Sequence, residues 1–234
     1  MPLVVKNLII INALFFLARY TLASTLNIDL NSVLGLYYYN SPEFNPYQLI
    51  SYMFMHGGFS HIFFNMFALW MFGTQIENLW GPKRFLNYYL ITGFGAAFLH
   101  YLIIHFQISG LESYFTSNQI SEIVNSGAFN PSSPLFSKAR MLYGLHHTPV
   151  VGASGAVFGL LLAYGMTYPN QIIYLNLLFP IKAKYFVIIY GLLEFVMGVQ
   201  NSAGDNVAHF AHIGGMLFGF LLIKYWKKND MNFY

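Results

Sequence analysis

Residues 59–106 read FSHIFFNMFALWMFGTQIENLWGPKRFLNYYLITGFGAAFLHYLIIHF, and this stretch decides the fold class. Two mostly apolar segments, 59–80 and 85–106, flank the short charged turn Gly81-Pro82-Lys83-Arg84. A hydrocarbon core of about 30 Å needs about 20 apolar residues per helix, so each segment is long enough to cross a membrane. Because the turn is so short, the two helices must be antiparallel neighbours. The stretch therefore predicts a transmembrane helical hairpin.

The composition of the whole chain agrees with a membrane protein. Its 234 residues are 56% hydrophobic and 8% charged, whereas soluble domains carry about 25% charged residues. The formal net charge is +3 and the basic residues do not cluster, so we expect no nucleic-acid partner. There is no cysteine, which excludes disulfides, thiolate metal sites and cysteine nucleophiles.

Four further apolar stretches raise the predicted number of spans to six, in one all-α polytopic domain over residues 1–234. They cover about 3–25, 151–168, 185–199 and 207–226, the core of the domain being about 48–226. The long connection 107–150 is polar, and its Ser, Asn and Pro content around 125–133 predicts irregular structure of unassigned role.

The distribution of Lys and Arg predicts the orientation of the spans. With a cytoplasmic N-terminus, most of these cations fall on the inner side, and Lys138 and Arg140 fall outside, with Arg19 reaching outward. The inner cations are Lys6, Lys83, Arg84, Lys182, Lys184, Lys224, Lys227 and Lys228. The positive-inside rule therefore places both termini in the cytoplasm. We expect an integral protein of a bacterial inner membrane, in contact with membrane lipids.

Polar side chains inside the predicted spans are candidates for function, because each costs several kcal/mol unless it is partnered. Ser154 opens the fourth span, His212 lies near the start of the sixth, and His61 and Asn65 lie one turn apart in the second. The predicted orientation puts all of them at a similar depth near the outer surface. A serine becomes a good nucleophile when a base such as histidine takes its proton. Ser154 and His212 are therefore sufficient for acyl transfer, and the Ser154 N–H, His61 and Asn65 could stabilise an oxyanion.

Small residues recur at four-residue spacing on two of the spans. Gly155 and Gly159 lie on the fourth span, and Ala211, Gly215 and Gly219 lie on the sixth. Such faces let two helix backbones approach closely in lipid. We therefore expect spans four and six to touch, as a Ser154–His212 hydrogen bond requires.

These residues resemble the rhomboid family of intramembrane serine proteases, over roughly residues 48–226. The motifs are Gly152-Ala153-Ser154-Gly155, the A-H-I-G-G around His212, His61-x-x-x-Asn65 after His56, and Glu77-x-x-x-Gly81. The resemblance implies that Ser154 attacks and that His212 acts as general base and then general acid. It also implies an oxyanion hole at His61 and Asn65, and transmembrane proteins as substrates.

Five further residues are expected to support the site. They are Gly152, Gly155, Phe158, His209 and Gly215. Many family members carry Tyr where this chain has Phe158, which keeps the ring and loses the hydroxyl. His209 is expected to line the polar cavity. Well-known members also carry a Trp-Arg pair in the first outer loop, and residues 26–47 contain neither residue type.

Other interpretations of the same residues remain open. A catalytically silent rhomboid-like protein would bind and route membrane clients, but it would be expected to have lost Ser154 or His212. A metal enzyme or transporter could use His56/His61 and His209/His212, yet no H-E-x-x-H is present and no carboxylate is expected at that depth. We therefore predict no metal and no cofactor.

Three acidic residues in or next to the predicted spans also need an interpretation. Asp205 lies seven residues before His212, so a Ser/His/Asp triad is conceivable, but a helix cap is the better interpretation of Asp205. Glu194 in the fifth span, like Glu77, is expected to be a hydrogen-bonded helix-packing group. The sequence predicts neither an oligomeric state nor a particular substrate.

Overall fold

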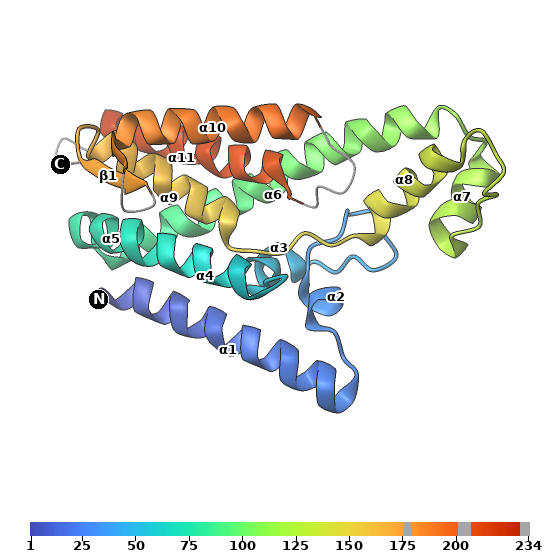
Figure 1. Ribbon diagram of the computed structural model, residues 1–234, viewed down its shortest axis with the longest axis horizontal. Coiled ribbons are helices and arrows are strands. Elements are labelled where there is room, and N and C mark those ends of the chain that lie inside the picture. Colours follow the sequence, from blue (N-terminus) through green and yellow to red (C-terminus); the bar gives the residue numbers. More distant parts are fainter. Residues whose placement is uncertain (176–178, 201–206, 230–234) are drawn as a thin grey trace.

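Each of the six predicted spans contains a helical segment in the computed structural model, which describes residues 1–175, 179–200 and 207–229 (Figure 1). The second span is continuous from 59 to 80 and contains one π-helical turn, η2. The segments are α1 (Leu3–Leu26), α4 (Phe59–Ala68) with η2 (Leu69–Gly73) and α5 (Thr74–Trp80), α6 (Pro82–Glu112), α9 (Ser154–Thr167), α10 (Ala183–Gln200) and α11 (His209–Asn229).

Three helices among the described residues are long and apolar enough to cross a membrane. These are α1, α6 and α10, and α9 is a shorter apolar helix. Many of the large apolar side chains of α1 and α10 are exposed, as expected where lipid replaces water. The chain is therefore a multi-pass membrane protein, while the number of six spans and the side on which the termini lie stay predictions.

The predicted hairpin turn is tighter than expected. Only Gly81 lies outside the helices, at φ 78°, a conformation that favours glycine. Pro82 begins α6, because proline lacks the N–H that would have no acceptor at that position. At its other end α6 continues to Glu112, beyond the predicted end at 106.

Helices α6, α9 and α11 pack together in the middle of the bundle, and the backbones of α9 and α11 approach closely. A Cβ atom added to Gly215 would overlap the carbonyl oxygen of Gly155. The contact predicted from the small residues is therefore present, and Gly215 makes it.

The other small residues face a different neighbour from the one predicted. A Cβ atom on Gly155 would overlap Ala96 of α6, and one on Gly159 would lie 2.7 Å from Thr92 of α6. Gly219 of α11 likewise faces the α6 side chain of Tyr88. The glycines on α9 thus let this helix also pack closely on α6, which holds Ser154 from a second side.

A buried carboxylate joins α5 to the start of α1. Glu77 is 3% exposed and accepts hydrogen bonds from the N–H groups of Val4 at 2.9 Å and Val5 at 2.8 Å. The first N–H groups of a helix have no intrahelical acceptor and favour a negative charge nearby. Glu77 therefore fixes where α1 docks.

The connection 107–150 is largely helical, which corrects the expectation of an irregular loop. It contains the end of α6, then α7 (Ser117–Ser126) and α8 (Phe136–His147), which lie beyond one end of the bundle (Figure 1). A capping box of Thr116 and Gln119 begins α7, and Gly127 ends it at φ 62°. Residues 127–135 form no regular element, in line with the prediction for 125–133.

The all-α prediction misses one short hairpin. Strand β1 (Ile172–Leu175) pairs antiparallel with β2 (Phe179–Lys182), with Ile172 opposite Lys182. The β-branched and aromatic residues of β1 favour a strand over a helix. The first connection adds α2 (Leu30–Leu34), α3 (Gln48–Ser51) and the 3₁₀ turn η1 (Tyr52–Phe54).

The α9–α11 contact yields a test of the packing. Replacing Gly215 by Ala should lower the free energy of unfolding by about 1–3 kcal/mol, because the added methyl group meets a backbone carbonyl that cannot turn away. SDS titration of the purified protein in detergent micelles measures this change. Gly110→Ala is the matched control, because a Cβ atom there meets nothing within 4 Å. Equal stabilities of Gly215→Ala and the wild type would contradict the packing.

Candidate active site

Ser154 is the first residue of α9, and the strand-like segment before it sets its position. Val150 pairs with Leu36, and the N–H of Gly152 donates to the carbonyl oxygen of Tyr52 at 2.9 Å. Gly152 has φ 130°, and a Cβ atom there would lie 2.8 Å from His61 Nε2. Only glycine therefore permits both this turn and the approach of His61.

His212 meets Ser154 across the α9–α11 contact. Its Nε2 atom lies 2.8 Å from Ser154 Oγ, within hydrogen-bond distance. The Phe158 ring stacks on the imidazole, with centroids 4.2 Å apart and planes 6° from parallel. His212 is 8% exposed, so this ring is held on one face by Phe158 and on one edge by Ser154.

A carboxylate from α10 contacts the other edge of the same imidazole. Glu194 Oε2 lies 2.8 Å from His212 Nδ1 and 2.6 Å from His209 Nδ1. A carboxylate accepts hydrogen bonds, so both Nδ1 atoms donate, and His212 Nε2 is left free to accept the Ser154 hydroxyl proton. This hydrogen-bond network assigns the tautomer of His212.

Sequence reasoning missed this role of Glu194. The sequence predicts a hydrogen-bonded packing group at Glu194 and no carboxylate beside the histidine pairs. The structure corrects that expectation, since Glu194 is 8% exposed and contacts His209 and His212 directly. The signal was available, because a lone acid within an apolar span marks a functional candidate. The alternative partner, Asp205, lies outside the described residues.

The three ligand atoms of Glu194, His209 and His212 lie within 4.8 Å of one another and would suit a metal ion by composition. The short Nδ1–Oε2 distances, however, already satisfy these atoms by direct hydrogen bonds. In the other histidine pair, the rings of His56 and His61 pack edge to face, with their centroids 5.0 Å apart.

His61 and Asn65 line the same cavity as Ser154 and His212. The N–H of Gly57 donates to His61 Nδ1 at 3.3 Å, which puts the His61 proton on Nε2, the atom next to Gly152. Asn65 is 6% exposed and donates to the carbonyl oxygen of His61 at 3.0 Å. His61 Nε2–H is therefore a hydrogen-bond donor beside Ser154.

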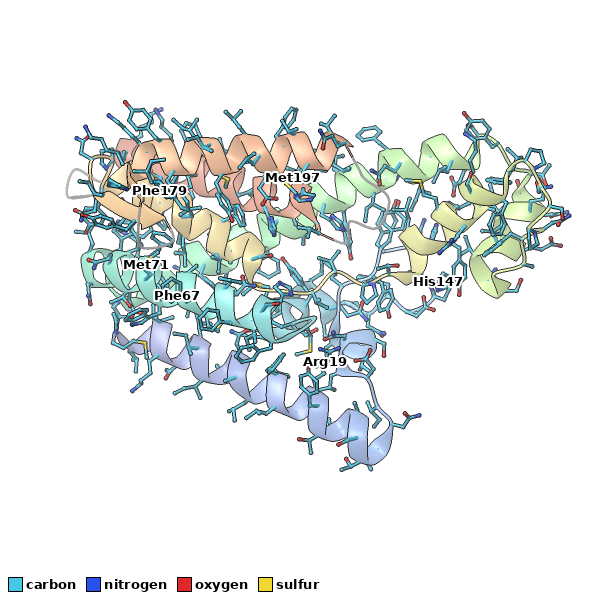
Figure 2. The ribbon with its side chains drawn as sticks, in the orientation of Figure 1. Arg19, Phe67, Met71, His147, Phe179 and Met197 are labelled. Atoms are coloured by element: carbon cyan, nitrogen blue, oxygen red, sulfur yellow. The ribbon has the colours of Figure 1, made fainter. Side chains whose placement is uncertain are left out.

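Arg19 of α1 supports the turn that precedes His61 (Figure 2). Its guanidinium donates to the carbonyl oxygens of His56 at 2.9 Å and Gly57 at 3.0 Å, and lies 3.7 Å from Asp29. Whether the side chain reaches toward the outer surface stays a prediction. Its bonds fix the backbone that carries the Gly57 N–H, in a chain whose first connection lacks the Trp-Arg pair.

The cavity at Ser154 has a volume of about 1630 Å³, larger than the roughly 300–1,000 Å³ of small-molecule pockets. Most of its walls come from α4, η2, α6, α8, α9, α10 and α11, and β1 adds two residues. Figure 2 shows the wall residues Phe67 and Met71 on one side and Met197 on α10. Arg140 and Met141 of α8 also line it. The cavity is therefore mostly apolar with a polar centre, and it is large enough for a peptide segment.

The family profile described as Rhomboid domain matches residues 43–228. RHOMBOID-like protein 12, mitochondrial, of Arabidopsis thaliana is 31% identical over 71% of this chain and 42% of its own length. RHOMBOID-like protein 4 of the same plant is 31% identical over 75% of this chain and 33% of its length. Rhomboid protease GluP of Bacillus subtilis (strain 168) is 28% identical over 74% of this chain and 25% of its length. The chain thus spans less than half the length of these relatives.

The contacts of Arg19 give a second prediction. Arg19→Gln should lower the free energy of unfolding by about 1–3 kcal/mol, because two carbonyl oxygens lose a charged donor. Urea or SDS titration followed by tryptophan fluorescence measures it. Lys6→Gln, the same change of charge at an exposed position of α1, should leave stability within about 0.5 kcal/mol of the wild type. If both variants behave alike, Arg19 does not support the turn.

Proposed function

This chain belongs to the rhomboid family, and from that membership we propose that it is an intramembrane serine endopeptidase that cleaves transmembrane segments of other membrane proteins. Members of this family are generally serine intramembrane proteases. The observation that carries the proposal is the 2.8 Å contact between Ser154 Oγ and His212 Nε2. A silent rhomboid-like protein has no need of such a contact.

In the proposed reaction, Ser154 is the nucleophile and His212 the base. His212 Nε2 takes the hydroxyl proton as Oγ forms a bond to the scissile carbonyl carbon. His212 then gives that proton to the departing amide nitrogen as the C–N bond breaks, leaving an acyl-enzyme. Water, deprotonated by the same Nε2, hydrolyses the ester and restores Ser154.

The negative oxygen of the tetrahedral intermediate needs donors that are already in place. We assign this task to the Ser154 backbone N–H, to His61 Nε2–H and to the side-chain amide of Asn65. This amide lines the same cavity and also donates to the carbonyl oxygen of His61. Ser154 begins α9, so its N–H has no intrahelical acceptor and lies at the positive end of the helix dipole. Three glycines support the site because they lack a Cβ atom. Gly152 leaves room for His61, Gly155 lets α9 approach α6, and Gly215 lets α11 approach α9.

The substrate class follows from the cavity and from the chemistry of a helix. A scissile amide inside a helix is shielded by its hydrogen bonds, so cleavage should favour segments with small or helix-breaking residues. In this proposal such an unwound segment enters the cavity, whose walls include Phe67 and Met197. Water for deacylation enters from the outer side.

We also propose the finer topology. The chain forms one domain over residues 1–234 with six spans, both termini in the cytoplasm and the site near the outer surface. Its low charge and its inner-side Lys residues suit a bacterial inner membrane. RHOMBOID-like protein 12 of Arabidopsis thaliana has a mitochondrial name, so the relatives are not confined to bacteria.

Substitution of Ser154 or His212 by Ala should each reduce turnover by more than about 1,000-fold, because the two groups act as a unit. The assay uses purified protein in liposomes with a labelled transmembrane substrate, and product is measured on gels. Ser24→Ala removes an exposed hydroxyl on α1 and should keep wild-type activity. Turnover that persists in either site variant would reject the mechanism. Binding of clients by the wild type with no cleavage would favour the silent alternative.

A further inference from the structure

We propose that Glu194 is a positioning residue and that Ser154, His212 and Glu194 form one hydrogen-bonded chain. We call this chain the relay, although no proton moves to Glu194. This inference rests on the proposed function and adds to it a third group, carried by a different helix from the other two. Glu194 holds the His212 ring in the tautomer that accepts the serine proton and offsets the positive charge that the ring gains during the reaction.

The geometry supports a relay and not only packing. Glu194 Oε2 contacts His212 on the edge opposite Ser154, at 2.8 Å from Nδ1. The second donor, His209 Nδ1 at 2.6 Å, holds the carboxylate in place. The two histidines are three residues apart on α11, so one carboxylate oxygen bridges successive positions of the same helix face.

The tautomer argument gives Glu194 its specific effect. Neutral imidazole carries one proton, and an acceptor at Nδ1 keeps that proton away from Nε2. An amide at position 194 could turn its NH₂ group toward Nδ1, which would favour a proton on Nε2. That nitrogen then could not accept the Ser154 proton.

The negative charge of Glu194 also favours transfer of the serine proton to His212. When Nε2 takes the serine proton, the ring becomes a cation in a poorly hydrated site, where a nearby negative charge counts for more than in water. A carboxylate at 2.8 Å is well placed to stabilise that cation. Burial of the acid is tolerated because two N–H groups partner it.

The relay and a metal site at the same atoms exclude each other. A metal ion held by the Nδ1 atoms would need their lone pairs, so neutral His212 would carry its proton on Nε2, facing Ser154. His212 would then have no lone pair for the serine proton. Metal content and the effect of a chelator therefore distinguish the two arrangements.

The test is Glu194→Gln, assayed with the full chain in liposomes on a labelled transmembrane substrate. We expect kcat to fall by about 100- to 10,000-fold, with KM changed by less than about threefold because the cavity wall keeps its shape. Glu194→Asp should recover at least part of kcat. The matched control is Glu77→Gln, a buried carboxylate that binds the start of α1, which should lower stability and leave the kcat of the folded protein unchanged.

A second measurement needs no variant at position 194. Nitrogen-15 NMR of histidine-labelled protein at alkaline pH, with the His212 signal identified from a His212→Asn sample, should show the neutral ring protonated at Nδ1. Protonation at Nε2 would overturn the proposal, even if Glu194→Gln fails to fold.

The outcomes separate the inference from the proposed function. A wild type that cleaves through Ser154, together with a Glu194→Gln variant of equal kcat, would overturn the relay and leave the protease standing. Stoichiometric metal with activity lost on chelation would also overturn the relay. A wild type that cleaves no substrate, with Nδ1 protonated in the NMR spectrum, would instead count against the proposed protease.

Discussion

The site depends on the close approach of two helix backbones. With no Cβ atom at Gly215, α11 rests against the Gly155 carbonyl of α9, which brings His212 within 2.8 Å of Ser154. In lipid, helix association has little hydrophobic driving force and relies on such close packing and on interhelical hydrogen bonds. A bulkier residue at Gly215 would push α11 away from α9 and break the hydrogen bond between Ser154 and His212. The same contact thus contributes to the stability of the bundle and to the chemistry of the site.

A second constraint is that polar groups at membrane depth need partners. Glu77 takes the first N–H groups of α1, Arg19 takes two carbonyl oxygens before α4, and Glu194 takes the Nδ1 protons of two histidines. Each of these bonds joins parts of the chain that are distant in sequence. Polar groups whose burial would be costly without partners therefore determine how the helices dock. Two of them support the site: Arg19 through the turn before His61, and Glu194 through its bond to His212.

The sequence predicts the helices well, because apolar length and a Gly-Pro turn are local signals. It also predicts that Ser154, His61, Asn65 and His212 lie together, because their positions near the starts of the second, fourth and sixth spans imply a shared depth. It misses α7 and α8, whose polar composition resembles that of a loop. It also misses the short β-hairpin. Neither the partner of Glu194 nor that of Arg19 could be predicted, because each depends on the rotation of a helix about its axis, which apolar composition does not set.

The direct test of the central claim is to map a fluorophosphonate adduct by mass spectrometry. The reagent needs an activated serine but no unwound substrate helix, so it reports on the Ser154–His212 pair itself. The account predicts an adduct on Ser154 in the wild type and its near-complete loss in His212→Ala. Equal labelling of Ser154 in the two proteins, or labelling of another serine only, would contradict it.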